Sequence, residues 1–187
     1  MIATFAALVC LMSPEEGLVC PLTQEEVNPG VEASLYNGIE FHFCCPDCAE
    51  KFAKDPISPL KSEKLNKLAS GVSYFDPVSR KRVVAGSKGG KVDFHGVRYY
   101  FETAANMKAF NTSPAKYTAM PTKECTTCPV MNEEIKNLKT AIAYRDIKGV
   151  RYYLCCAGCI GPFDKETAKY TAKVTDLVKP VAVTVIK

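Results

Sequence analysis

The residues that could do chemistry in this chain are its ten cysteines. Six of them form two clusters of the form Cys-Cys-x-x-Cys, at residues 44–48 and 155–159, and each cluster follows a run of aromatic residues. A Cys-Pro pair precedes each cluster, at Cys20 and at Cys128. Repeated local clusters suit one ion with several neighbouring thiolates better than they suit scattered disulfide bonds. The sequence therefore predicts two metal sites built from cysteine.

The C-terminal cluster has the fuller set of ligands. Two cysteines on a tight turn precede it by 26 residues, so one tetrahedral ion could be held by Cys125, Cys128, Cys155 and Cys159. A thiolate in the first turn of a helix also gains from the amide dipoles there, which lower its pKa. Cys156 lies between the last two ligands, and we expect its side chain to point away from the ion.

The N-terminal cluster offers three thiolates that align with this set, namely Cys20, Cys44 and Cys48. Gly17 stands where the other site has Cys125, so a fourth ligand must come from elsewhere. Cys45, His42 or water could supply it, and Cys156 is the corresponding additional candidate in the other cluster. Three thiolates suit Cu⁺, which accepts three-coordination, and also Zn²⁺ with an exogenous ligand. We therefore expect Zn²⁺ or Cu⁺ as the bound ion.

A third segment, residues 97–106, repeats the aromatic run of the two clusters but contains no cysteine. Asp76, Glu102 and Asn106 stand at the positions of the three shared ligands. Oxygen ligands could take a harder ion, but these side chains lack a fixed tetrahedral set. We interpret this segment as a copy of the unit that is retained for packing.

This repeat predicts an α+β fold of tandem small units, each a β-hairpin followed by a short helix, packed together because a unit of about 50 residues buries little surface alone. The expected units span residues 17–59, 74–117 and 124–170, and are called here the first, second and third units. Residues 60–73 are expected to form a connecting helix, and residues 171–187 to contain a closing strand that covers a sheet edge. Asn37-Gly38 predicts a type I′ hairpin, and residues 86–90 a hairpin loop in the second unit.

The remaining composition narrows the partners and the location. Residues 1–16 are a mostly apolar segment that is too short to span a bilayer and lacks the leading basic residue of an export signal. The location is thus the cytoplasm or, if this segment is a signal remnant, the cell envelope. The net charge of +4, with Lys and Arg dispersed, is too mild to predict a nucleic-acid partner.

Taken together, these motifs resemble the YHS and TRASH family of small metal-binding modules. The first and third units resemble the TRASH form, and the second resembles the YHS form without cysteines. The resemblance rests on the following residues: Cys20-Pro21, Phe41, Phe43, Cys44, Cys48 and Phe52; Asp76-Pro77-Val78, Tyr99-Tyr100-Phe101, Phe110, Pro114 and Tyr117; Cys128-Pro129-Val130, Tyr152, Tyr153, Cys155, Cys159, Phe163 and Tyr170. It implies a treble-clef-like fold and a role in heavy-metal trafficking, resistance or sensing.

The chain departs from the family pattern at two kinds of position. Thr23, Ser79 and Met131 stand where the family often has a further cysteine. Cys45 and Cys156 stand where the family commonly has serine. The first departure removes a fourth ligand, and the second adds candidates.

The function that we expect is non-enzymatic binding of a heavy metal, with a metal-transfer protein as partner. One alternative is a structural zinc module that presents a protein-interaction surface. The minor alternative is a thiol oxidoreductase, because the clusters contain CxxC pairs, although no surrounding βαβ pattern accompanies them. With two histidines in the chain, metal catalysis that depends on histidine is not favoured.

Overall fold

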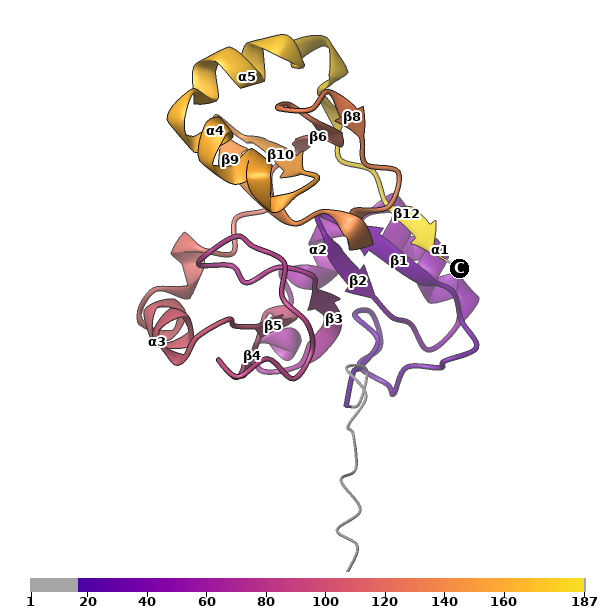
Figure 1. Cartoon of the computed structure of the whole chain (residues 1–187). Coiled ribbons are helices and arrows are strands. Elements are labelled where there is room, and N and C mark those ends of the chain that lie inside the picture. The colour runs from indigo at the N-terminus through magenta and orange to yellow at the C-terminus, as the bar shows by residue number, and fades with distance from the viewer. Residues whose placement is uncertain (1–16, 187) are drawn as a thin grey trace, which may run out of the picture.

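The computed structural model describes residues 17–186, which adopt an α+β fold of small sheets and short helices (Figure 1). Among these residues the strands form a six-stranded, a four-stranded and a two-stranded sheet. The predictions about residues 1–16 lie outside the described part of the chain. Within that part, no helix has the length and apolar character needed to cross a membrane.

The first unit contains the hairpin and helix that its sequence predicts. Strand β1 (Ala33–Tyr36) pairs with β2 (Ile39–Phe41), and helix α1 (Pro46–Lys54) follows. The turn residues Asn37 and Gly38 have φ values of 53° and 74°, the left-handed pair that a type I′ turn requires. The predicted type I′ hairpin is therefore confirmed. The short helix α2 (Ile57–Leu60) follows α1.

The other two units repeat this order of elements. Strand β3 (Ala69–Ser73) precedes the second unit, which contains β4 (Lys91–Phe94), β5 (Gly96–Tyr100) and α3 (Ala104–Thr112). The third contains β6 (Lys123–Cys125), β7 (Thr127–Cys128), β8 (Glu133–Glu134), β9 (Ala143–Ile147) and β10 (Val150–Leu154). In both, a two-residue turn with two positive φ values joins the hairpin strands, at His95-Gly96 and at Lys148-Gly149.

Each unit encloses an aromatic core between its hairpin and its helix. Phe52, Phe110 and Phe163 are fully buried at equivalent positions of the three helices. Each contacts a ring of its own hairpin or strand end, with centroid distances of 4.8 Å from Phe41 to Phe52 and 6.0 Å from Tyr152 to Phe163. The helix is thus fixed against the hairpin, and its first turn is held beside the strand end.

The predicted connecting helix over residues 60–73 is wrong. This segment contains the end of α2, a 3-10 turn at Glu63–Leu65 and strand β3. Strand β3 pairs antiparallel with β2 and parallel with β5, so the first two units share the sheet β12-β1-β2-β3-β5-β4. The edge of β2 thus gains a partner, and tertiary pairing outweighs the local helical periodicity.

The predicted hairpin around residues 86–90 is also not formed. Strand β4 pairs with β5, the strand that follows it in the sequence, and not with residues 80–84. Residues 80–82 lie against the third unit instead. The Arg82 N–H donates to the Ile142 carbonyl at 2.6 Å, and the Tyr144 N–H donates to the Arg80 carbonyl at 2.9 Å. These residues therefore connect the second unit to the third.

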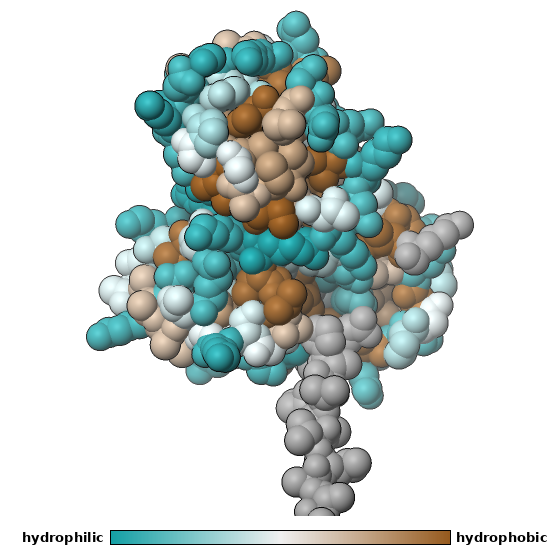
Figure 2. All heavy atoms as spheres, viewed as in Figure 1, coloured by the Kyte–Doolittle hydropathy of each residue, from teal (hydrophilic) through white to brown (hydrophobic). Residues whose placement is uncertain are grey.

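The C-terminal segment returns from the third unit to the first. Strand β11 (Lys179–Pro180) pairs with β6, and β12 (Thr184–Ile186) pairs antiparallel with β1 at the edge of the six-stranded sheet. The predicted closing strand is thus found in the last part of its expected range. Figure 1 shows the third unit above the other two, and in Figure 2 hydrophilic side chains cover much of the visible surface where they meet.

The short helix expected after the hairpin of the third unit is interrupted. It comprises a 3-10 turn at Ala157–Cys159, helix α4 (Ile160–Lys165) and helix α5 (Thr167–Lys173). The hydroxyl of Thr167 donates to the Phe163 carbonyl at 2.9 Å, which satisfies an acceptor near the break at Glu166.

Arg151 anchors the third unit on the hairpin turn of the first. Its side chain is 5% exposed and lies 4.0 Å from the ring centroid of Tyr144. Its guanidinium donates to the Asp146 carboxylate at 2.8 and 2.9 Å, to the Asn37 carbonyl at 2.7 Å and to the Ala119 carbonyl at 3.2 Å. One buried cation thus satisfies acceptors from three segments of the chain.

Replacing Arg151 with alanine should lower the free energy of unfolding by about 3–5 kcal/mol, because it leaves a partly buried carboxylate and two carbonyls without their donor. Urea denaturation of the full chain measures this loss. The control is Arg145→Ala, which removes a pair with Asp164, a carboxylate that is 46% exposed, and should cost about 0–1 kcal/mol. Equal losses in the two variants would show that Arg151 does not anchor the junction.

Candidate metal centres

Each unit contains the same tight backbone turn, which we call the knuckle. In every knuckle a carbonyl accepts the N–H of the residue four positions later, and that residue has φ between 57° and 62°. The donor and acceptor pairs are Gln24 to Cys20 at 2.9 Å, Arg80 to Asp76 at 2.7 Å, and Asn132 to Cys128 at 2.8 Å. Flanking antiparallel partners repeat at the same spacing: Val19 with Glu26, Phe75 with Arg82, and Thr127 with Glu134.

At two of the three knuckles, a knuckle cysteine lies beside two further cysteines, so that three sulfur atoms form a group. The first thiol cluster is Cys20, Cys44 and Cys48, and the second thiol cluster is Cys128, Cys155 and Cys159. In each cluster the three Sγ atoms lie within 4.8 Å of one another. The two clusters take the same three positions of their units: the knuckle, the end of the hairpin and the first turn that follows it.

The spacing of the sulfur atoms fits one metal ion. The Sγ atoms of Cys44 and Cys48 are 3.8 Å apart, and those of Cys155 and Cys159 are 3.7 Å apart. A tetrahedral zinc ion with sulfur at about 2.3 Å separates its ligands by about 3.8 Å. The residues present therefore fit a thiolate-bound ion without rearrangement of these pairs.

Backbone N–H groups prepare the knuckle cysteine to carry a negative charge. Burial of Cys20 opposes its ionisation, but N–H groups of Cys44, Thr23 and Leu22 directed at its sulfur outweigh burial and lower its pKa to about 7. The pKa of Cys128 is likewise lowered, against burial, by the equivalent N–H groups of Cys155, Met131 and Val130. We call this set of three donors the N–H cradle.

The other cysteines of the two clusters have raised pKa values. Burial, followed by the neighbouring thiols, raises the pKa of Cys48 well above its usual value. The same causes raise the pKa of Cys159. Burial also raises the pKa of Cys155, to about 11. Without an ion, each cluster thus holds thiolate character at the knuckle and protons on its other cysteines.

In the second unit the N–H cradle holds a carboxylate. Asp76 is fully buried, and its Oδ1 accepts the N–H groups of Val78 at 2.8 Å and Ser79 at 3.2 Å. Its Oδ2 accepts the Glu102 N–H at 2.9 Å and the Asn106 Nδ2 at 2.7 Å. Since both oxygens are occupied, this unit links its knuckle to its helix by direct hydrogen bonds.

The structure brings together three of the four cysteines expected at the second cluster and leaves out Cys125. Its buried thiol donates to the Thr127 carbonyl at 3.3 Å, and its residue lies opposite Tyr152 in the pairing of β6 with β10. This position precedes the knuckle turn, so only Cys128 is carried to the cluster. Both clusters therefore contain three thiols.

The two additional cysteines lie at the edges of the clusters. The Sγ of Cys45 is 3.8 Å from that of Cys44, and the Sγ of Cys156 is 3.3 Å from that of Cys159. As expected, Cys156 is not one of the three facing sulfurs of its cluster, but its exposed side chain stays close to Cys159. The backbone at Cys156 is extended, with φ of −147° and ψ of 162°, and the 3-10 turn that follows brings Cys159 back beside it.

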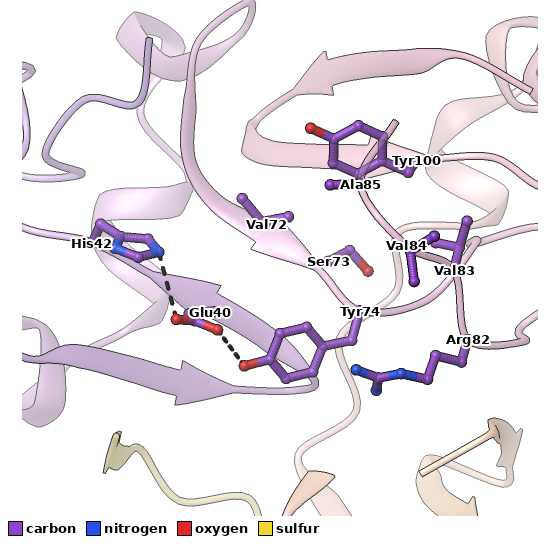
Figure 3. Close-up of a pocket in the computed structure, with 10 residues that line it drawn as sticks. All are labelled: Glu40, His42, Val72, Ser73, Tyr74, Arg82, Val83, Val84, Ala85 and Tyr100. Atoms are coloured by element: carbon purple, nitrogen blue, oxygen red, sulfur yellow. Dashed lines mark hydrogen bonds and ion pairs between the residues drawn. The ribbon is translucent and has the colours of Figure 1, made fainter. Parts of the chain in front are cut away.

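His42 lies in a different place, a pocket of about 210 Å³ between the units (Figure 3). Its Nε2 is 3.8 Å from Oε1 of Glu40, and it belongs to neither thiol cluster. Glu40 also accepts from the Tyr74 hydroxyl, and at 2.9 Å from the Lys139 ammonium of the third unit. Burial opposes the ionisation of Glu40, but these partners outweigh it and lower its pKa. Here His42 takes part in a polar junction.

The N–H cradle and the bond between Asp76 and Asn106 were not predicted from the sequence. Their signal was present in the alignment of the three units, where Asp76 matches Cys20 and Asn106 matches Cys48. An acid at a buried position, followed by an amide at a ligand position, indicates a hydrogen-bonded replacement of an ion.

No protein-family model, curated protein or solved structure matches the chain. The assignment of the two thiol clusters as candidate metal centres therefore depends on their geometry and donor chemistry.

Replacing Asp76 with asparagine should lower the stability of the metal-free protein by about 2–3 kcal/mol, because hydrogen bonds to a buried charged acceptor are lost and an amide group faces N–H donors. Chemical denaturation in the presence of a chelator measures the change. Asp164→Asn is the matched control at a partly exposed carboxylate, with an expected cost of about 0–1 kcal/mol. An Asp76→Asn variant as stable as the wild type would contradict the proposed role of this carboxylate.

Metal affinity should rise with pH. Cys48, Cys155 and Cys159 have raised pKa values and so hold protons in the metal-free protein, and a bound ion must displace them. Lowering the pH from about 9 to about 6 should therefore weaken binding and increase proton release per ion. Chelator competition at several pH values, corrected for the chelator's own protonation, measures the trend. Affinity that does not change over this range would exclude thiols as the ligands.

Proposed function

We propose that the chain is a non-enzymatic metal-binding protein that holds one soft or borderline ion at each of its two thiol clusters. The observation that carries the proposal is the occurrence of two equivalent groups of three sulfur atoms, with pairs separated by 3.8 and 3.7 Å. Thiolates at this separation bind Zn²⁺ and Cu⁺ in preference to hard ions. The proposed role is the trafficking, resistance response or sensing of such an ion.

The number of thiols sets the coordination. Three thiolates complete the site for Cu⁺, whereas Zn²⁺ takes a fourth ligand. Cys44 and Cys155 are only partly buried, so each cluster is open on the side of its hairpin end. A small exogenous ligand such as water, or a further thiol, can complete a zinc site from that side.

The proposal includes three tandem copies of one small module, similar to the YHS and TRASH modules. The repeated knuckle, hairpin turn and helix support this view, since all three occur in the same order in each unit. In this scheme the first and third copies bind metal, and the second keeps the scaffold through Asp76 and Asn106.

A structural zinc module is the second candidate, and one observation favours it. An ion at either cluster would connect the knuckle to the following helix, as the hydrogen bond of 2.7 Å from Asn106 to Asp76 does in the second unit. A structural ion is expected to be indispensable for folding. The two candidates therefore differ in what happens on metal removal. Retention of the far-ultraviolet circular dichroism spectrum after chelation favours trafficking or sensing, and its collapse favours the structural role.

The test is the stoichiometry of the full chain titrated with Zn²⁺ under reducing conditions, or with Cu⁺ under anaerobic conditions. We expect two ions per chain, one for Cys48→Ser, and none held tightly by the double variant Cys48→Ser/Cys159→Ser, because each change removes one of three thiolates. Elemental analysis after removal of free metal measures the content.

Cys125→Ser is the matched control, since it removes a buried cysteine that lies outside both clusters and keeps a hydroxyl donor for the Thr127 carbonyl. This variant should still bind two ions. A wild-type chain that binds no ion, or a Cys125→Ser chain that loses one, would contradict the proposed sites.

A further inference from the structure

The N-cap residue that precedes the helix after each hairpin differs between the three units. Cys45, Thr103 and Cys156 hold equivalent N-cap positions with extended backbone, at φ of −152°, −139° and −147°. The Thr103 hydroxyl accepts the N–H of Asn106 at 3.2 Å and so caps its helix. Neither cysteine makes a cap hydrogen bond of ordinary geometry, although the N–H groups of Cys48 and Cys159 point toward the sulfurs of Cys45 and Cys156.

Cysteine at an N-cap position forgoes a stabilising interaction. Ser, Thr, Asp and Asn are preferred there because a side-chain oxygen accepts an otherwise unpaired N–H, whereas a thiol sulfur is a weak acceptor. The second unit shows that the backbone geometry allows the bond. A local rule that is broken at two of three equivalent positions is typical of residues retained for chemistry.

Both N-cap sulfurs lie within reach of a cluster. Cys45 is 3.8 Å from Cys44, and Cys156 is 3.3 Å from Cys159, measured between Sγ atoms. Neither belongs to the group of three sulfurs that face one another. Each neighbours the hairpin-end and helix ligands and sits at the edge of its cluster.

Exposure distinguishes Cys156 from the ligands of its own cluster. Cys128 and Cys159 are buried and Cys155 is partly buried, whereas Cys156 is exposed. In the first cluster Cys20 and Cys48 are buried, and Cys45 is partly buried. The ligand Cys44 is partly buried as well, so exposure does not separate Cys45 from the ligands of the first cluster. In the second cluster Cys156 lies at the solvent side of the ligands, where an acceptor molecule can approach.

We propose that Cys45 and Cys156 are exchange ligands, which take the ion from the three-thiolate clusters and present it to a thiol-bearing acceptor protein. The proposal rests on the metal binding proposed above and assigns its route of release. In each exchange one metal–sulfur bond forms and one breaks, and the ion keeps its oxidation state. The incoming thiol gives its proton to the solvent, and the departing thiolate takes one up.

The test compares the full chain with the double variant Cys45→Ser/Cys156→Ser, both loaded with Zn²⁺. Release is followed by absorbance after addition of excess 4-(2-pyridylazo)resorcinol. The variant should bind the same number of ions, with affinity within about threefold of the wild type. Its release should be slower by about tenfold, because the intermediate ligand is missing. Its metal-free form should unfold at a higher temperature, because serine can cap both helices.

Thr103→Ser is the matched control at the same position of the unit without thiols, and its release rate should equal that of the wild type. If the serine variant does not fold, Cys45→Thr/Cys156→Thr repeats the test with the residue that the second unit uses. Equal release rates from loaded wild type and variant overturn the exchange role and leave the proposed function intact. Loss of loading in the variant alone also overturns it, because the cysteines would then be resident ligands. A wild type that does not load overturns both proposals.

Discussion

Each unit depends on three backbone N–H groups that point at one anionic side chain. Two of them come from the knuckle and the third from the end of the hairpin. The side chain that accepts them therefore joins two segments that lie far apart in the sequence. Buried N–H groups need an acceptor, and a charged acceptor satisfies them better than a neutral one. The side chain is a cysteine with a lowered pKa at Cys20 and Cys128, and an aspartate at Asp76. The same requirement therefore fixes the knuckle whether or not a metal is bound.

What differs between the units is the link from this anion to the helix. In the second unit the Asn106 amide donates directly to Asp76, whereas in the other two a helix cysteine faces the knuckle sulfur. An ion between thiolates makes the same connection that the amide makes. The second unit thus holds its knuckle to its helix with hydrogen-bonding side chains at the positions where the other two units have cysteines. The scaffold is also stabilised by the sheet that the first two units share. Its stability therefore does not depend on an ion at the thiol clusters alone.

The sequence predicted the features that short-range signals control. The Asn37-Gly38 turn, the helix after the first hairpin, the α+β class and the six sulfurs of the clusters all follow from local patterns. It failed where tertiary contacts decide. Gly71 lies so close to Phe41 that a Cβ there would be 2.6 Å from the ring. This close backbone approach belongs to strand β3, which lies in the segment predicted as a connecting helix. The exclusion of Cys125 and the approach of Cys156 to Cys159 likewise depend on strand register and turn geometry.

X-ray absorption at the metal edge of the loaded full chain tests the central claim most directly, because it reports the type and distance of the ligands. For Zn²⁺ the account predicts a shell dominated by sulfur at about 2.3 Å, with about three sulfurs per ion and one lighter ligand. For Cu⁺ it predicts sulfur alone, in about three-fold coordination. A shell dominated by nitrogen or oxygen would contradict the assignment of the two thiol clusters as metal centres.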